Sequence, residues 1–127
     1  MRLSIEHIAV ERAGISFELR CEPASARVSA AQAEQALRLL PNLGRHVCVN
    51  EKGDCFADEI VGTEPAHLFE HVAIELMARE HGSGEGLMGH SSHIGEPGLM
   101  AVKLTYADDL VALSCAKRAL EFVNGPG

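Results

Sequence analysis

The sequence predicts an α+β domain, with one antiparallel or mixed sheet and helices packed on one of its faces. Two observations support this class: alternating apolar segments bounded by turn residues, and longer segments in which apolar residues recur at helical spacing. The 127 residues contain no linker, so we expect a single domain spanning 1–127. The predicted order of elements is ββ-α-ββ-α-β-α, and hairpins mixed with single helices are typical of α+β sandwiches.

The first three predicted elements are a hairpin and a helix. Residues 3–10 and 15–20 alternate between apolar and polar side chains on either side of a glycine turn. Residues 30–40 are rich in strong helix formers. Ser29 is a suitable N-cap for this helix, and Pro41 ends it.

The middle of the chain predicts a second hairpin and a second helix. Short strands at 45–50 and 55–62 flank the turn segment Glu-Lys-Gly-Asp. Thr63 is placed to cap the helix that follows at 65–80. Pro65 suits the first turn of that helix.

The last part of the chain predicts a loop, a strand and a helix. Repeated glycines indicate a loop at 82–98, and loops of this length are usually functional or mobile. A strand at 99–106 follows, and then a helix at 110–123 with Asp108 or Asp109 as its N-cap.

Composition excludes several classes of protein. The net charge of −7 argues against nucleic-acid binding, which normally requires a basic patch. No apolar run approaches the ~18 residues of a membrane helix, and Glu6 and His7 interrupt the N-terminal segment, which is therefore not a signal peptide. We expect a cytoplasmic protein with free thiols. Cys48 and Cys115 lie in apolar patterns typical of core positions.

One predicted helix places His67, Glu70 and His71 within five residues. On a helical wheel of roughly 100° per residue, these side chains share a narrow arc with Ile74 and Ala78. The broad opposite arc is apolar and is the predicted core face, formed by Leu68, Phe69, Val72, Ala73, Leu76 and Met77. Apolar neighbours around polar side chains are typical of a cleft wall rather than of open solvent.

The spacing of these three side chains suits a metal site. Two histidines four residues apart present neighbouring rings, and they can bind one Zn²⁺ at about 2.0–2.1 Å each. Glu70 reaches the open side of such a metal, where a carboxylate can take a proton from bound water. The H-x-x-E-H string is the inverzincin pattern. The pattern alone is equally compatible with two surface histidines on an ordinary helix.

A hydrolytic zinc site needs three protein ligands and leaves the fourth position for water. Asp108 and Asp109 are candidates for the third ligand, although an aspartate before a helix is more often an N-cap. His90 and His93 are alternatives, as ligands, as substrate-binding residues or as ordinary loop residues. Weaker candidates are Glu85 and Glu96. No role is assigned to the other histidines, His7, His46 and His81.

The stretch Ala-His-Leu-Phe-Glu-His-Val resembles the zinc-helix motif of the pitrilysin-type metallopeptidases. Over a longer stretch, about residues 60–123, the sequence is more similar to the N-terminal domain of cyanophycin synthetase. The motif positions matched are His67, Leu68, Glu70, His71, Ala73, Glu75 and Leu76. A glycine-rich turn, a strand, an acidic pair and a helix with spaced alanines follow in the same order.

This resemblance implies an α+β fold similar to half of a pitrilysin-type domain, with a metal-dependent hydrolytic site that cleaves a polymer of aspartate and arginine. It implies His67 and His71 as metal ligands and Glu70 as the general base. By position, Asp109 or Asp108 is the third ligand. The acidic pair of that family is usually glutamate, and residues 89–95 replace a segment that carries arginine. The 127 residues contain no ATP-dependent ligase domain, so we expect no polymer synthesis.

We therefore expect a zinc-dependent hydrolase that cleaves peptide or isopeptide-like amide bonds. The alternative is a non-catalytic metal-binding or accessory domain, and the short chain favours it because few walls remain for a substrate cleft. A second copy of the chain can supply a missing wall, so a homodimer is compatible with either hypothesis. Neither hypothesis involves nucleic acid or a membrane.

Overall fold

The computed structural model describes residues 1–50, 53–82, 86–105 and 108–125, and it describes only the backbone of 48–50, 53 and 54. The Cys48 side chain, predicted as a core residue, therefore lies outside the described part. Cys115 is buried, as predicted. The elements are β1 (Arg2–Val10), β2 (Gly14–Glu22), α1 (Ala30–Leu39), the 3₁₀ helix η1 (Pro41–Arg45), β3 (Val47–Asn50), β4 (Gly53–Cys55), α2 (Phe56–Glu59), α3 (Pro65–His81), β5 (Gly89–His93), β6 (Leu99–Thr105) and α4 (Asp109–Asn124).

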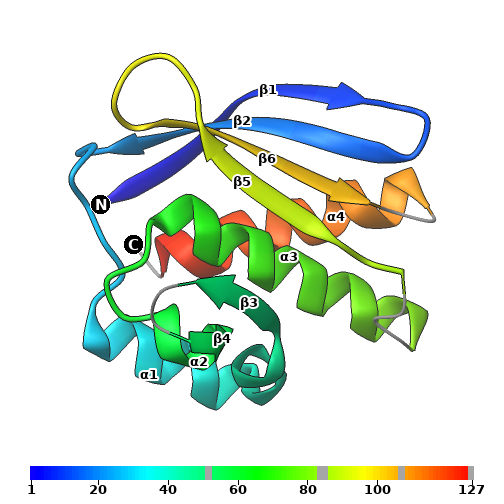
Figure 1. Ribbon diagram of the computed structural model, residues 1–127. Coiled ribbons are helices and arrows are strands. Elements are labelled where there is room, and N and C mark those ends of the chain that lie inside the picture. Colours follow the sequence, from blue (N-terminus) through cyan, green and yellow to red (C-terminus); the bar gives the residue numbers. More distant parts are fainter. Residues whose placement is uncertain (51–52, 83–85, 106–107, 126–127) are drawn as a thin grey trace.

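The main sheet has four strands in the order β1-β2-β6-β5, and every pair is antiparallel. Helices α3 and α4 lie next to each other beneath one face of this sheet (Figure 1). The predicted α+β class is confirmed, and the sheet is antiparallel rather than mixed.

The core forms between this face of the sheet and the two helices. Alternate residues of β2, namely Ile15, Phe17 and Leu19, are fully buried because a strand directs every second side chain to the same face. The Phe17 ring meets the Phe69 ring of α3 edge-on, with centroids 5.6 Å apart. The buried face of α3 is thus the apolar arc that the helical wheel predicts.

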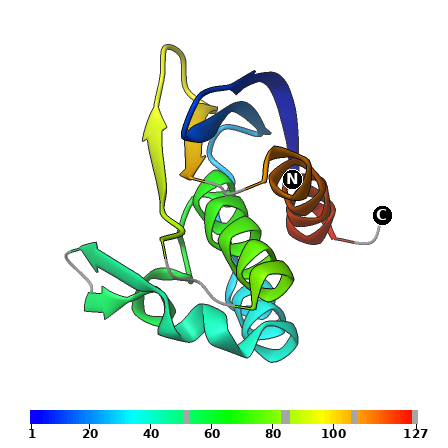
Figure 2. The same cartoon turned by 90° about the vertical axis from the view of Figure 1, so that its right-hand side faces the viewer.

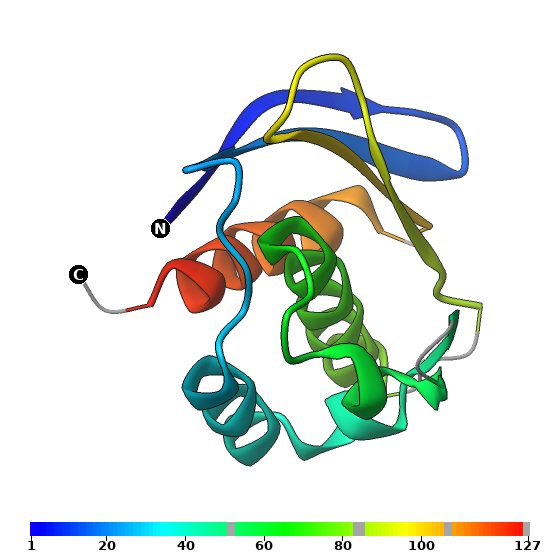
Figure 3. The same cartoon turned by 60° about the vertical axis from the view of Figure 1, so that its left-hand side comes forward.

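A third layer lies on the other side of α3. The segment from α1 through η1, the β3–β4 hairpin and α2 packs beneath that helix, as the views in Figures 1 and 3 show. Because α3 lies between this segment and the sheet, its polar arc is covered as well as its apolar arc. Glu70, His71 and Glu75 are therefore buried.

The predicted strand at 55–62 is wrong beyond its first residue. Cys55 ends β4, and Phe56–Glu59 form α2 instead. Phe56 and Ile60 are both fully buried, while Ala57 and Asp58 between them are exposed. In a strand, Phe56, Asp58 and Ile60 would share one face, so the exposure of Asp58 between two buried residues fits a helical turn instead.

The predicted loop at 82–98 is also wrong in part, because Gly89–His93 form strand β5. This strand pairs with β6, with Ser91 opposite Val102. Glycine, serine and histidine carry little intrinsic preference for a strand, so the pairing depends on β6 and not on local sequence. Counting the main sheet and the helices, the order is ββ-α-η-α-α-ββ-α, with the small β3–β4 hairpin between η1 and α2.

The ends of the helices follow the predictions with one exception. Ser29 caps α1 in a capping box with Gln32, and Pro65 is the first residue of α3. Thr63 is not the N-cap of α3, which is Glu64 and has no side-chain capping bond. No helix in the described ranges is long and apolar enough to cross a membrane.

Candidate metal centre

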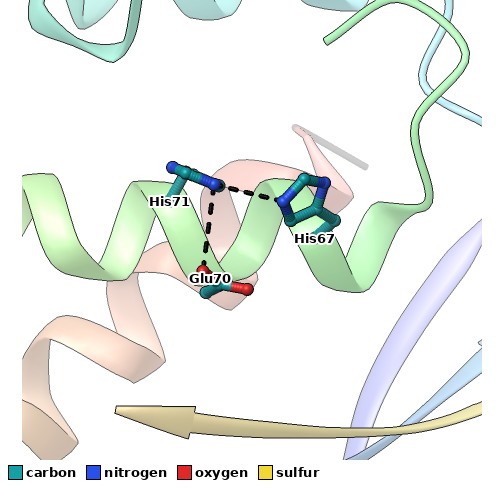
Figure 4. A group of neighbouring side chains, drawn as sticks. All are labelled: His67, Glu70 and His71. Carbon is teal, nitrogen blue, oxygen red and sulfur yellow. Dashed lines mark hydrogen bonds and ion pairs between the residues drawn. The ribbon is translucent and has the colours of Figure 1, made fainter. Parts of the chain in front are cut away.

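The first half of α3 brings His67, Glu70 and His71 together, as Figure 4 shows. The two Nε2 atoms of the histidines lie 3.1 Å apart, and Glu70 Oε2 lies 3.8 Å from His71 Nε2. Two nitrogens bound to one tetrahedral zinc at about 2.05 Å lie ~3.3 Å apart. The spacing of the two imidazoles therefore fits a shared metal ion. Within the described residues, His67, Glu70 and His71 form the group that could hold a metal ion.

Burial changes the protonation of all three side chains. Loss of solvent raises the pKa of Glu70 to about 7, and a hydrogen bond with Ser91 opposes part of this rise. Burial, together with the neighbouring His67 and His46, lowers the pKa of His71 to about 3. Burial also lowers the pKa of His67. Both imidazoles are consequently neutral near pH 7, which is the form that binds metals.

Oxygen atoms surround the other ring nitrogen of His67. Thr63 Oγ1 lies 2.9 Å from His67 Nδ1, and Glu59 Oε1 lies 3.7 Å from the same atom. Thr63 therefore orients the His67 ring instead of capping α3. Outer partners of this kind fix the ring orientation of metal-binding histidines.

His46, to which the sequence assigned no role, lies against His71. The Nδ1 atoms of the two rings are 3.0 Å apart, and His46 Nε2 lies 3.2 Å from Glu75 Oε1. On its other side, the His71 ring stacks on Phe56 with centroids 3.9 Å apart and planes 13° from parallel. Glu75 lies one helical turn after His71, so the sequence spacing predicts that the two side chains are neighbours. No local sequence pattern predicts that His46 lies next to His71.

A cleft of about 780 Å³ opens beside the group. Glu70, His71, Ile74 and Ala78 form one wall, which confirms the interpretation of this arc as a cleft wall. The η1–β3 segment and the start of β5 supply the other walls, through Asn42, Arg45, His46, Val47, Leu87, Met88 and Gly89.

Strand β5 passes very close to Glu70. A Cβ atom at Gly89 would lie 2.7 Å from Ile74 Cδ1 and 2.8 Å from Glu70 Cγ. A larger residue at this position would displace one of these side chains, so glycine permits the close approach of strand and helix.

The other candidate ligands lie elsewhere in the described chain. Asp108 accepts hydrogen bonds from the backbone N–H groups of Leu110 and Val111, and is therefore the N-cap of α4. Helices α3 and α4 run antiparallel in Figures 1 and 2, so α4, which begins at Asp109, starts toward the C-terminal end of α3, whereas the cluster lies in the first half of α3. The group of His67, Glu70 and His71 that could hold a metal ion does not include either aspartate.

The two histidines of β5 are exposed and are likewise not part of that group. His90 lies opposite Lys103 in the sheet. His93 Nε2 lies 2.9 Å from Glu64 Oε1 at the start of α3. Of the weaker candidates, Glu96 pairs with Arg20, and Glu85 lies outside the described residues.

Comparison with known proteins adds one finding. The family described as the cyanophycin synthase-like N-terminal domain matches residues 15–125. The chain belongs to this family. The match extends from β2 to the end of α4, so it includes η1, β3 and α2, which precede the region on which the sequence resemblance rests. A search of curated proteins gave no match.

Proposed function

We propose that this member of the cyanophycin synthase-like N-terminal domain family is a zinc-dependent hydrolase that cleaves peptide or isopeptide-like amide bonds. One observation carries the proposal: the neutral imidazoles of the half-buried His67 and the buried His71, with Nε2 atoms 3.1 Å apart, lie beside a buried carboxylate at the wall of a cleft. A purely structural polar cluster does not need a carboxylate with a pKa of about 7.

Each side chain then has a distinct role. His67 and His71 would hold the metal through Nε2, and zinc bound there would supply an activated water molecule and a Lewis acid for the carbonyl group. Glu70 takes a proton from the attacking water and returns it to the leaving amine, which its pKa of about 7 suits near neutral pH. The cleft supplies a partly dry environment in which these charges interact strongly.

The position of β5 supports an extended, amide-containing substrate. In the described part of the chain β5 is an edge strand of the sheet, and its first residue lines the cleft. An extended peptide can add to such an edge through backbone hydrogen bonds, which would bring its carbonyl groups next to Glu70. Arg45 and Arg79 at the cleft suit substrates that carry carboxylates, such as polymers of aspartate and arginine.

Three proteins test this proposal: the wild type, Glu70→Gln and His71→Ala. Metal content is measured after dialysis against zinc, and hydrolysis is measured on peptides and on aspartate–arginine isopeptides. We expect about one zinc per chain in the wild type and in Glu70→Gln, with hydrolysis reduced at least ~100-fold in Glu70→Gln. His71→Ala loses both. His7→Ala, an exposed histidine on β1 at the opposite edge of the sheet, is the matched control and keeps both.

Zinc-supplied wild type that binds no zinc would overturn the proposal. A second candidate function is a non-catalytic accessory domain with a structural metal, and the presence of Glu70 within the ligand group favours it. In that case Glu70→Gln weakens zinc binding, and the wild type hydrolyses none of the substrates. Light scattering measures whether a second copy contributes to either function, since a homodimer would add a wall to the cleft.

A further inference from the structure

We propose that His46 and Glu75 are positioning residues, which hold the His71 ring in the tautomer that leaves Nε2 free to bind a metal. The inference rests on the proposed metal site and extends it, because neither residue belongs to the H-x-x-E-H motif or to the ligand group. It assigns a role to a segment, η1 and the start of β3, that lies far from α3 in the sequence.

The chain of contacts begins at Glu75. This carboxylate is buried, and Oε2 receives hydrogen bonds from Arg79 Nε at 3.2 Å and Asn42 Nδ2 at 3.4 Å. A carboxylate without a proton can only accept hydrogen bonds, and Glu75 accepts from both of these donors. Since Glu75 Oε1 lies 3.2 Å from His46 Nε2, that ring nitrogen carries the proton and donates it.

The tautomer of His46 then determines the tautomer of His71. A neutral imidazole with its proton on Nε2 has a lone pair on Nδ1. The two Nδ1 atoms are 3.0 Å apart, so His71 donates from Nδ1 and His46 accepts. His71 Nε2 is left with a lone pair that faces His67. Phe56 stacks on the His71 ring and fixes the orientation of the ring, and therefore the direction of this lone pair.

His67 is held in a matching way. Thr63 Oγ1 and the Glu59 carboxylate both lie next to its Nδ1, which favours a proton at that nitrogen and a lone pair at Nε2. The two Nε2 lone pairs then face each other across 3.1 Å with no proton between them. This arrangement is repulsive by itself and becomes favourable when a cation lies beside both atoms.

A different hydrogen-bond pattern would contradict the proposal. If His46 carried protons on both nitrogens, it would donate to His71 Nδ1, and His71 would direct an N–H group from Nε2 toward His67. That N–H group would occupy the position of a metal. The two patterns differ in where the protons lie, and nitrogen NMR of the histidine side chains measures this directly.

The first experiment uses wild-type protein labelled with ¹⁵N-histidine and loaded with zinc. We expect His46 to be neutral, with its proton on Nε2 and Nδ1 as a hydrogen-bond acceptor. A His46 ring with its proton on Nδ1, or on both nitrogens, would overturn the proposal. The measurement needs no substitution and does not depend on activity.

The second experiment measures zinc affinity by competition with a chromophoric chelator. His46→Phe and Glu75→Leu remove the acceptor for His71 and for His46, and each should weaken zinc binding about 10- to 100-fold. Glu75→Gln keeps an acceptor oxygen and should remain within a few-fold of wild type. His90→Phe, at an exposed histidine outside the candidate metal group, is the matched control and should not change the affinity.

The outcomes separate the two proposals. Wild type that binds no zinc refutes the proposed function. Wild type that binds zinc, with His46→Phe and Glu75→Leu binding equally well, refutes the positioning role alone. A Glu75→Gln protein that binds as weakly as Glu75→Leu shows that the charge matters and not the acceptor, and so refutes the tautomer mechanism. If Glu75→Leu fails to fold, His46→Phe and the NMR measurement decide.

Discussion

His71 is the residue on which most contacts of the site converge. It stacks on Phe56, meets His46 and His67 through its two nitrogens, and lies beside Glu70. Only 4% of its surface is exposed. A neutral imidazole is tolerated in such surroundings, but an imidazolium would lose its hydration and would lie beside two other histidines, His67 and His46.

This burial predicts acid sensitivity in the metal-free protein. The folded-state pKa of His71 is about 3, well below the usual value of 6.5, so the unfolded chain binds the extra proton first. Its contribution to stability is therefore complete above about pH 6.5 and is lost as the pH falls toward 3. Urea unfolding between pH 7 and 4 should show a shallower decline in the free energy of unfolding for His71→Phe than for wild type.

The difference in slope should approach 1.4 kcal/mol per pH unit, which is roughly the effect of one proton. His90→Phe is the control, because His90 is exposed in both states. Equal slopes for His71→Phe and the wild type would contradict the assignment of His71 as a buried neutral histidine.

At the scale of elements, Asp108 at the start of α4 has two candidate roles, helix N-cap and metal ligand. Asp108 accepts two backbone hydrogen bonds at the start of this helix. The family resemblance instead implies a metal ligand at Asp109 or Asp108. A cap needs only a side-chain oxygen, whereas a third zinc ligand at this position needs the carboxylate. Substitutions that keep one property and remove the other distinguish the two roles.

Asp108→Ala should lower the free energy of unfolding by about 1 kcal/mol, because the N-terminal N–H groups of α4 lose their acceptor. Asp108→Ser keeps an acceptor and should lose only a few tenths of a kcal/mol. Zinc affinity should be unchanged in both variants. Chemical denaturation and zinc competition measure these quantities. A tenfold loss of zinc affinity in Asp108→Ser would instead identify a ligand.

Short elements were harder to predict than long ones. The long helix at 65–80 was predicted almost to its ends, because sixteen residues repeat the helical period several times. Segment 56–59 is a single helical turn after a strand, too short for its period to be distinguished from alternation. Strand β5 has no apolar alternation, and only its backbone pairing with β6 makes it a strand.

At the scale of the molecule, the candidate metal site joins three parts of the fold. His67 and His71 belong to α3, His46 follows η1, and Gly89 and Ser91 of β5 lie against Glu70. A ligand that binds only the folded state stabilises all of these contacts at once. A metal bound here should therefore affect global unfolding and not merely the local order of α3.

Zinc at about 100 times its dissociation constant should add roughly 2.7 kcal/mol to the free energy of unfolding. For a chain of this size, that corresponds to a rise in Tm on the order of 10 °C. Differential scanning calorimetry with zinc and then with excess chelator measures the effect and its reversal. His67→Ala should remove the response, and His90→Ala should retain it. An equal response in His67→Ala would place the zinc elsewhere.

The sequence by itself determined the α+β class, the long helix and the grouping of His67, Glu70 and His71, because helical geometry brings residues three and four positions apart onto one face. The tertiary structure decided what surrounds that face. It buried Glu70 and His71, placed His46 and Phe56 on either side of the His71 ring, and brought β5 against Glu70. These contacts join segments more than ten residues apart in the sequence. Local periodicity cannot predict them, because they form only when the layers pack together.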